Sequence, residues 1–398
     1  LIERGIKKIY VELLKSDFKE KEHKPIIIGI TGTNGKTSTA LLLAQSLTYQ
    51  NKKVGVISSE GSGIYPKLVA NEYTTPPIDI CYRYQRFFCK KKCDYVIIEC
   101  SSQGLHQGRL DGIHFTYSII TNIDAEHLDF YKSLENLKKN FSSFIEKTPS
   151  LGKTFLCIDD KNIKEVIKKT NNKNFYTYGL SKDANFNITN TLQKEKYSEF
   201  NLKIKIPGSK KEIKKIKIPL IGMHNIKNAA SCAAVAFLIG INDKTIKEGL
   251  KNFKGVQRRF NFLFKKNDAL FFDDYAHHPT EISSVLEGVK EVYKKKEIIC
   301  IFQPHRISRV KNLKFEFSRS FKKADTVILC PIYKASENIK LGFAYEKFAK
   351  LIIKNSNVSL IKIENEDSLK KLIKQTGYGE KIYIGMGAGS ISNWMRNL

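Results

Sequence analysis

One segment near the start of the chain combines glycine, lysine and hydroxyl residues in a spacing that can hold phosphate groups. Glycines let backbone N–H groups approach phosphate oxygens, a lysine neutralises the β- and γ-phosphates, and a threonine hydroxyl can bind Mg²⁺. The segment therefore predicts a site for a nucleoside triphosphate and Mg²⁺. Its residues are Gly32, Thr33, Asn34, Gly35, Lys36, Thr37 and Ser38.

The flanking sequence supplies the strand and the helix that such a loop requires. Residues 25–30 form a short apolar run, which predicts a buried parallel strand. From residue 36 to about residue 50, apolar side chains recur at helical spacing. Ile30 stands where the more widespread form of this loop has a further glycine. That difference favours a distinct subfamily over a generic P-loop ATPase.

Glu99 follows another apolar run, residues 95–98. In folds with a phosphate loop, an acidic residue at such a strand end holds the metal ion together with the loop hydroxyl. We therefore expect Thr37 and Glu99 to bind Mg²⁺. A solvated strand end is the alternative interpretation of Glu99.

Strands alternate with helices along most of the chain, which predicts an α/β fold with parallel sheets. A domain boundary is expected near residues 253–255, because the alternation of strands and helices restarts after them. We therefore expect a central P-loop ATPase domain at residues 26–254 and a C-terminal Rossmann-like domain at residues 255–398. Residues 154–218 mix short strands with charged turns. The other expected elements are a helix at residues 225–239 and strands at residues 54–57, 117–120, 270–273, 298–302, 326–330 and 382–384.

Composition excludes several classes of protein. A hydrophobic content of 41% without a long apolar run argues against a membrane span. The net charge of +28 comes from dispersed lysines, which favours anionic substrates over a nucleic-acid partner. The eight cysteines lack the spacing of a metal site, so we expect buried thiols in a reducing cytoplasm.

Motifs in collinear order from about residue 26 to the end of the chain resemble the Mur ligase family, which builds the peptide of the cell-wall precursor. They are the loop at residues 31–37, residues 121–123 with Glu126 and His127, and residues 222–225 with Asn228. The resemblance implies an ATP- and Mg²⁺-dependent ligase that forms an amide through an acyl phosphate. Its substrates would be a UDP-sugar nucleotide and an amino acid, and it would act as a monomer or weak homodimer.

The second half resembles the branch of the family that joins L-alanine to UDP-N-acetylmuramate. Two stretches depart from that branch, since residues 74–76 and 99–102 look more like the ligases that add a diamino acid as the third residue. Asn34 also stands where the alanine-adding enzymes usually carry histidine. Phe141, however, stands where the third-residue ligases use a carbamylated lysine. The motifs that favour L-alanine lie at residues 255–260, 273–281, 302–306, 332–337 and 387–389.

The resemblance also assigns roles to individual residues. Lys36, His127 and Arg259 would be catalytic, with His127 binding a second Mg²⁺ and Arg259 reaching the γ-phosphate; Arg258 is the rival for that role. His224 and Asn225 would contact adenine and Asp274 the ribose. His277 and His278 would pack beside the nucleotide. The residues expected to bind substrate are Thr74, Thr75, Ser101, Arg109, Tyr275, His305, Arg306 and Arg309.

Members of the family carry an N-terminal domain that holds the UDP moiety, whereas 25 residues precede the first strand here. We therefore expect that domain to be missing, with residues 1–25 a remnant or linker. Three functions stay open from the sequence: the L-alanine ligase, the ligase that adds a diamino acid to the UDP-MurNAc-dipeptide, and a non-catalytic ATP-binding fragment or regulatory protein. The glycine-rich segment at residues 385–389 lacks a following βαβ unit, which argues against NAD.

Overall fold

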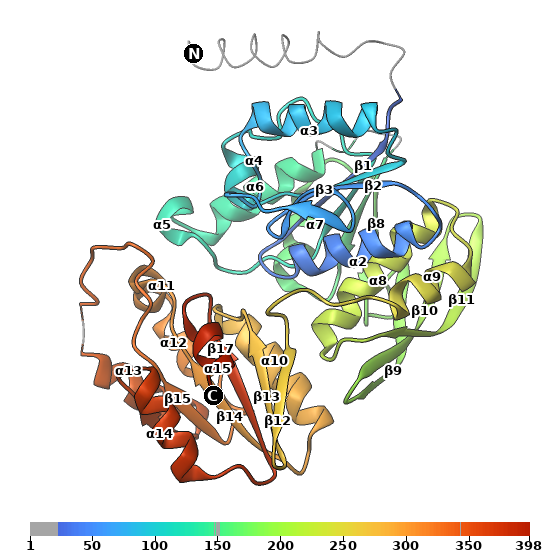
Figure 1. Cartoon of the computed structure of the whole chain (residues 1–398). Helices are drawn as coiled ribbons and strands as arrows, with labels where there is room; N and C mark the ends of the chain where they lie inside the picture. Colours follow the sequence, from blue (N-terminus) through green and yellow to red (C-terminus); the bar gives the residue numbers. More distant parts are fainter. Residues whose placement is uncertain (1–22, 147, 149–151, 343) are drawn as a thin grey trace. The chain divides into compact units, whose positions relative to one another are not determined.

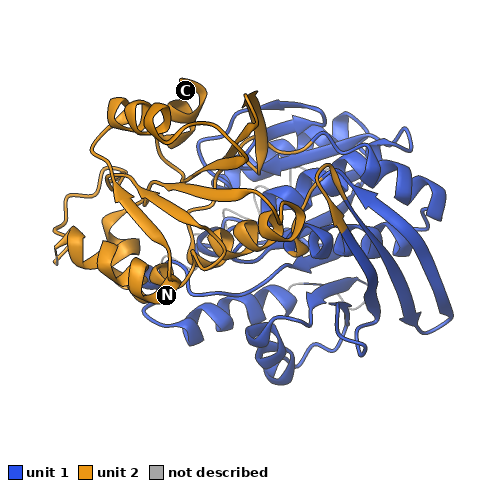
Figure 2. Cartoon of the chain, turned by 90° about the horizontal axis from the view of Figure 1, so that it is seen from below, with its two compact units in different colours: residues 1–192, 198–219, 224–254 blue, residues 193–197, 220–223, 255–398 orange. Residues whose placement is uncertain are grey.

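The computed structural model describes residues 23–146, 148, 152–342 and 344–398. The expected remnant or linker at residues 1–25 lies almost wholly outside these described residues. The chain divides into two compact units, which Figure 2 shows in blue and orange. Unit 1 comprises Leu1–Leu192, Ser198–Pro219 and His224–Lys254, and unit 2 comprises Gln193–Tyr197, Leu220–Met223 and Gly255–Leu398. Within the described residues, no helix is both long and apolar enough to cross a membrane.

Unit 1, which runs from blue to yellow in Figure 1, is built on an eleven-stranded sheet in the order β11-β10-β9-β8-β7-β6-β1-β5-β2-β3-β4. The strands from β2 through β5, β1, β6, β7 and β8 to β9 pair in parallel. Their bounds are β1 (Ile26–Thr31), β2 (Val54–Ser58), β3 (Gly61–Ile64), β4 (Lys67–Val69), β5 (Tyr95–Glu99), β6 (Tyr117–Ile120), β7 (Lys153–Cys157), β8 (Phe175–Gly179), β9 (Phe186–Lys194), β10 (Tyr197–Ile206) and β11 (Ser209–Ile218).

The central strands of this sheet are mostly buried because helices cover both faces of a parallel sheet. Every residue of β2 and β5 is buried, as their continuous apolar runs predict. The helices of unit 1 are α2 (Lys36–Thr48), α3 (Ile78–Lys90), α4 (Ser102–His106), α5 (Leu128–Tyr131), α6 (Leu134–Glu146), α7 (Lys161–Lys169), α8 (Met223–Leu238) and α9 (Asp243–Lys251).

Unit 2 has a six-stranded sheet in the order β12-β13-β17-β14-β15-β16. All pairs are parallel except β12 with β13. The strands are β12 (Asn261–Lys266), β13 (Ala269–Asp274), β14 (Glu297–Phe302), β15 (Thr326–Leu329), β16 (Ser359–Lys362) and β17 (Lys381–Met386). The helices are α10 (Pro279–Val292), α11 (Ile307–Asn312), α12 (Lys314–Ser318), α13 (Tyr345–Ser356), α14 (Glu366–Thr376) and α15 (Ile391–Arg396).

The predicted α/β class is confirmed, and the expected apolar strands lie within a residue or two of their predicted bounds. The predicted parallel sheets are antiparallel at their edges, since β3, β4, β11 and β12 each pair antiparallel with a neighbour. In each of these pairs only a few residues join the two strands, and so short a connection can only return the chain antiparallel. All eight cysteines are buried free thiols, as expected.

Candidate active site

The phosphate loop lies between the end of β1 and the start of α2, as the sequence predicts. Gly32 and Gly35 have φ angles of 132° and 85°, a region that residues with a Cβ atom rarely occupy. A Cβ atom at Gly32 would collide with the Thr121 hydroxyl, and one at Gly35 would lie 2.9 Å from Oδ1 of Asn228. Both glycines are therefore required by the backbone conformation of the loop and by its close neighbours.

The segment after β6 holds the phosphate loop from the side. The Thr121 hydroxyl and the Asn122 amide donate hydrogen bonds to Asn34 O at 2.6 and 2.8 Å. In return, Asn34 N donates to Oδ1 of Asn122 at 2.9 Å, and Thr33 N donates to Asn122 O at 3.0 Å. In the sequence, Thr121 and Asn122 stand out only as part of a motif, whereas the structure shows that they position the phosphate loop.

Two donors of the loop are suited to phosphate oxygens. Lys36 Nζ lies over the loop and donates to Gly32 O and Thr33 O, both at 2.7 Å. The Asn34 side chain has a buried Nδ2 atom without a hydrogen-bond partner among the described residues. An unsatisfied buried N–H costs about 1–3 kcal/mol, and an anionic oxygen bound in the loop would remove that cost. The loop therefore fits a bound nucleotide phosphate.

Glu99 is the carboxylate beside the loop, and it is 1% exposed. Its oxygens accept hydrogen bonds from the Thr37 hydroxyl at 3.0 Å and from Ser59 N at 2.9 Å. No Lys, Arg or His in the described part of the chain forms an ion pair with it. A buried carboxylate without a cation is costly unless it binds a metal ion, and Mg²⁺ prefers such oxygen ligands. Thr37 and Glu99 therefore fit Mg²⁺.

His127 lies in the loop after β6 as the residue that precedes α5, and its φ angle of 50° is unusual for a residue with a side chain. Within the described residues, no three His, Cys, Asp or Glu side chains gather closely enough to hold a metal ion. A metal at this site would therefore need oxygens from substrate or water. The second-metal role of His127 stays a prediction.

The predicted substrate residues of unit 1 form one network with Glu99. Thr75 donates from its hydroxyl to Glu99 O at 2.8 Å and accepts from Ser101 N at 2.8 Å. Arg109 donates to Thr75 O at 2.7 Å. Thr74 accepts a hydrogen bond from the Ser59 hydroxyl at 3.0 Å, and that hydroxyl also reaches Glu99. The structure thus brings these residues together beside the proposed Mg²⁺ ligand.

The start of α8 is also close to the phosphate loop. Asn228 lies against Gly35, and the Cys232 thiol donates to Thr39 O of α2 at 3.4 Å. His224 and Asn225 occupy the first turn of the same helix. This placement is compatible with an adenine contact by His224 and Asn225, which stays a prediction.

In unit 2, the predicted residues gather where parallel strands end. Tyr275 follows β13, His305 and Arg306 follow β14, and Tyr333 follows β15. Backbone bonds join these loops, because Arg306 N donates to Tyr333 O at 2.8 Å and Tyr333 N donates to Pro304 O at 2.8 Å. The carboxyl ends of parallel strands are where open α/β sheets bind ligands. Tyr333 was not predicted from the sequence as a single site residue.

The two neighbouring arginines have different surroundings. Arg258 donates to Gly387 O at 2.6 Å, and its Nε lies 3.8 Å from the buried carboxylate of Asp273. Arg259 instead lies 3.5 Å from the Glu281 carboxylate. Both guanidinium groups lie over the Tyr275 ring, at 4.8 and 5.4 Å from its centroid. Arg258 therefore holds the backbone of unit 2 together, which leaves Arg259 as the better candidate for a phosphate contact.

Asp274, expected at the ribose, is 3% exposed. Its Oδ2 accepts from Phe260 N and its Oδ1 from Ala276 N, both at 2.7 Å. These bonds fix the backbone at Phe260 and at Ala276, which follows Tyr275, so the geometry supports a positioning role. A ribose contact stays a prediction. Burial raises the pKa of Asp274 from 3.8 to about 6, and the positive charge of Arg259 opposes that rise.

The raised pKa of Asp274 predicts how stability depends on pH. The folded state favours the protonated carboxyl, so this contribution to stability is complete below pH 3.8 and is lost as pH rises through about 6. The loss should amount to roughly 3 kcal/mol. Urea unfolding at several pH values measures the free energy of unfolding. As pH rises from 3.8 through about 6, this free energy should fall in the parent relative to Asp274→Asn. A constant difference between the two proteins would contradict the assignment.

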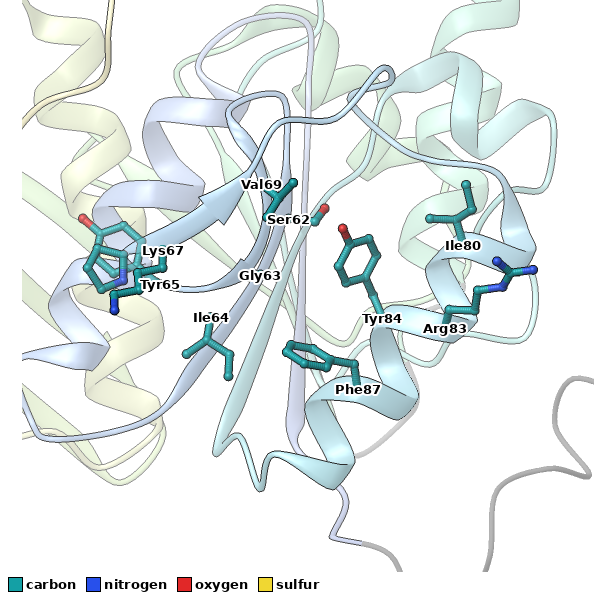
Figure 3. A pocket seen from close by; sticks show the side chains of 11 residues that line it. Ser62, Gly63, Ile64, Tyr65, Lys67, Val69, Ile80, Arg83, Tyr84 and Phe87 are labelled. Carbon is teal, nitrogen blue, oxygen red and sulfur yellow. The ribbon is translucent and has the colours of Figure 1, made fainter.

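A separate hollow of about 900 Å³ lies between the β3–β4 hairpin and α3 (Figure 3). Ile80, Tyr84 and Phe87 face it from one side of α3, and Ile64 and Val69 face it from the hairpin. None of the site residues predicted from the sequence lines this hollow, so it has no part in the proposed function.

Comparisons with known proteins agree with this geometry. Residues 30–236 match the Mur ligase middle domain, and residues 258–389 match the Mur ligase glutamate ligase domain. The UDP-N-acetylmuramate–L-alanine ligase of Pelagibacter ubique is 50% identical over 93% of this chain and 75% of its own length. That of Brachyspira hyodysenteriae is 33% identical over 92% of this chain and 73% of its own length.

Solved structures share the fold at lower identity. The UDP-N-acetylmuramate–alanine ligase of Thermotoga maritima is 22% identical with a TM-score of 0.67, and the match covers 98% of this chain and 77% of that one. The MurF ligase of Thermotoga maritima, solved in complex with ADP, is 16% identical with a TM-score of 0.70 over 99% of this chain and 82% of that one. The two domain matches and the 50% identical relative establish that this chain belongs to the Mur ligase family.

Proposed function

We propose that this chain is an ATP-dependent ligase that joins L-alanine to UDP-N-acetylmuramate. The observation that carries the proposal is the 50% identity, over 93% of the chain, to a relative named for that reaction. The structure supports it with a phosphate loop beside a buried carboxylate and with a cluster of His and Arg side chains at the strand ends of unit 2.

The proposed reaction has two steps. The substrate carboxylate attacks the γ-phosphorus of ATP, so a carboxylate–phosphorus bond forms, the bond to the bridging oxygen of ADP breaks, and an acyl phosphate results. The amino group of L-alanine then attacks the acyl carbon, inorganic phosphate leaves, and the nitrogen gives up a proton. Such a reaction depends on positioning and on neutralising charge more than on a reactive side chain.

Residues of unit 1 would act in the first step. Lys36 and the N–H groups of the phosphate loop would hold the β- and γ-phosphates. Mg²⁺, held by Thr37 and Glu99, would supply charge neutralisation when bound. Arg109, Thr74 and Ser101 would orient the substrate carboxylate from the network that contains Glu99.

Residues of unit 2 would act in the second step. Arginine suits a carboxylate because its guanidinium can donate two parallel hydrogen bonds, so Arg306 and Arg309 would bind the carboxylate of the amino acid. His305 lies beside Arg309, and the Tyr275 ring contacts His277, whose ring contacts His305. Arg259 is the exception in unit 2, because it would act in the first step by stabilising negative charge on the transferred phosphoryl group.

The third-residue ligase is the second candidate. Residues 74–76 and 99–102 favour it, and the network around Glu99 contains both stretches. Against it, Phe141, at the position of the carbamylated lysine in that branch, is fully buried in the core. A hydrophobic side chain buried there offers no ligand to a metal ion or phosphate.

Phosphate release with a panel of substrates distinguishes these functions. We expect release only when ATP, Mg²⁺, UDP-N-acetylmuramate and L-alanine are all present. Release that requires the UDP-MurNAc-dipeptide and a diamino acid would establish the second candidate. ATP binding without any ligation product would establish a non-catalytic ATP-binding protein.

Replacing His127 by alanine should lower the rate of phosphate release about 10²-fold or more if this side chain helps to neutralise the reacting groups. His114, which is exposed, provides a matched control as His114→Ala. The same assay measures both variants. Full activity of His127→Ala would remove His127 from the mechanism.

A further inference from the structure

Ser59 stands between the buried carboxylate of Glu99 and the hydroxyl of Thr74. It directly follows β2, which pairs in parallel with β5, so it lies beside the end of β5 where Glu99 stands. Ser59 is exposed, whereas Glu99 is 1% exposed. Ser59 therefore connects the proposed metal ligand with the protein surface, although no sequence pattern marks it as a site residue.

The turn that carries Ser59 is held in place by Asn71. The side-chain amide of Asn71 donates to Ser58 O at 3.0 Å and to the Ser62 hydroxyl at 2.6 Å, so it ties both ends of the turn together. Asn71 stands shortly before Thr74 in the chain. These bonds therefore also keep Thr74 close to Ser59.

The Ser59 hydroxyl lies within hydrogen-bonding distance of three oxygens but carries one hydrogen. Its Oγ atom is 3.2 and 3.1 Å from the two carboxylate oxygens of Glu99 and 3.0 Å from Oγ1 of Thr74. Between the two hydroxyls, a distance of 3.0 Å fits donation in either direction. The Thr74 hydroxyl has no other hydrogen-bond partner in the described part of the chain. The direction of the bond between Ser59 and Thr74 therefore depends on how strongly Glu99 attracts the hydrogen of Ser59.

We propose that Ser59 couples Mg²⁺ at Glu99 to the hydrogen that Thr74 can donate, and so acts as a positioning residue for the substrate. An ionised carboxylate is a stronger acceptor than a hydroxyl, so without a cation Ser59 donates to Glu99 and Thr74 donates to Ser59. A cation on Glu99 offsets the negative charge that attracts this hydrogen. Ser59 then donates to Thr74, and the hydrogen of Thr74 is available to a ligand.

The coupling rests on the proposed function, because there Thr74 helps to orient the substrate carboxylate. A carboxylate can only accept hydrogen bonds, so it needs the hydrogen of Thr74. Without the metal ion, Thr74 must first give up its bond to Ser59. With the metal ion bound, the hydrogen is already free. Metal ion and substrate should therefore each strengthen the binding of the other by the equivalent of one hydrogen bond.

Equilibrium binding measures this coupling without turnover. The affinity of the full chain for UDP-N-acetylmuramate is determined by calorimetry with saturating ADP, once in excess Mg²⁺ and once in EDTA. The ratio of the two affinities is the strength of the coupling. We expect Ser59→Ala and Thr74→Val each to lower this ratio about 3- to 10-fold relative to the parent, the effect of one hydrogen bond.

Further variants distinguish the coupling from a structural effect. Ser59→Thr and Thr74→Ser keep both hydroxyls and should keep the ratio of the parent. The variant that combines Ser59→Ala with Thr74→Val should lower the ratio no further than either change alone, because both residues belong to one hydrogen-bonded unit. If Ser59 only oriented Glu99, Thr74→Val would leave the ratio unchanged. That result, or reductions that multiply in the combined variant, would overturn the proposal.

The same measurements separate this inference from the proposed function. If the parent forms the alanine amide but the ratios differ from these expectations, the coupling alone is wrong. If the parent binds UDP-N-acetylmuramate without forming the amide, the ratios still decide the coupling. If it neither binds this substrate nor forms the amide, the proposed function is wrong and the coupling falls with it.

Discussion

Replacing Lys36 by alanine should reduce ATP-dependent phosphate release about 10³-fold or more, because the variant loses the positive charge at the β- and γ-phosphates. Lys36 Nζ is held over the loop by Gly32 O and Thr33 O, so the charge is already in place before a nucleotide binds. A side chain that needs no reorganisation stabilises the transferred phosphoryl group fully at the moment of transfer.

Two control variants make this result interpretable. Lys90→Ala removes an exposed lysine at the end of α3 and should leave the rate unchanged. Lys36→Met keeps most of the apolar stem of the side chain and should be as inactive as Lys36→Ala if charge is the cause. Circular dichroism should show that all three variants are folded. An active Lys36→Met would show that the stem, and not the charge, matters.

Replacing Glu99 by glutamine should lower the maximal rate and the apparent affinity for Mg²⁺, together by about 10²-fold. Glutamine has almost the same shape, and its amide oxygen can still accept one of the hydrogen bonds from Thr37 and Ser59. What it removes is the negative charge that would hold the metal ion. Rates measured across a Mg²⁺ titration separate the two effects.

Thermal stability gives Glu99→Gln a second readout. A buried carboxylate without a cation destabilises a protein, so in buffer without Mg²⁺ the variant should melt at the same temperature as the parent or higher. Addition of Mg²⁺ and ATP should stabilise the parent more than the variant. Glu72→Gln, at an exposed position, is the matched control. An unchanged Mg²⁺ requirement in Glu99→Gln would remove Glu99 from the metal site.

The parts of the fold that the sequence predicted well are those with strong local signals. Strand β1 and helix α2 are specified by an apolar run, two glycines and helical spacing, all within one short segment. The β3–β4 hairpin was missed because its strands have only four and three residues and carry little apolar pattern. Strands β12 and β16 were also missed. They lie at the edges of the second sheet, where strands are partly exposed and mix polar with apolar residues.

The candidate site, too, could be predicted only in part from the sequence. Residue types and spacing pointed to Lys36, Thr37 and Glu99, because each has a chemical property that the phosphate site needs. The sequence could not separate Arg258 from Arg259, since the difference depends on Asp273, Gly387 and Glu281, which lie in other parts of unit 2.

The acyl phosphate is the central claim about the chemistry, and an isotope transfer tests it most directly. UDP-N-acetylmuramate labelled with ¹⁸O in its carboxylate is incubated with this protein, ATP, Mg²⁺ and L-alanine, and the released phosphate is analysed by mass spectrometry. We expect each phosphate to carry one oxygen from the labelled carboxylate, in step with formation of the alanine amide. Unlabelled phosphate accompanying the amide product would contradict it.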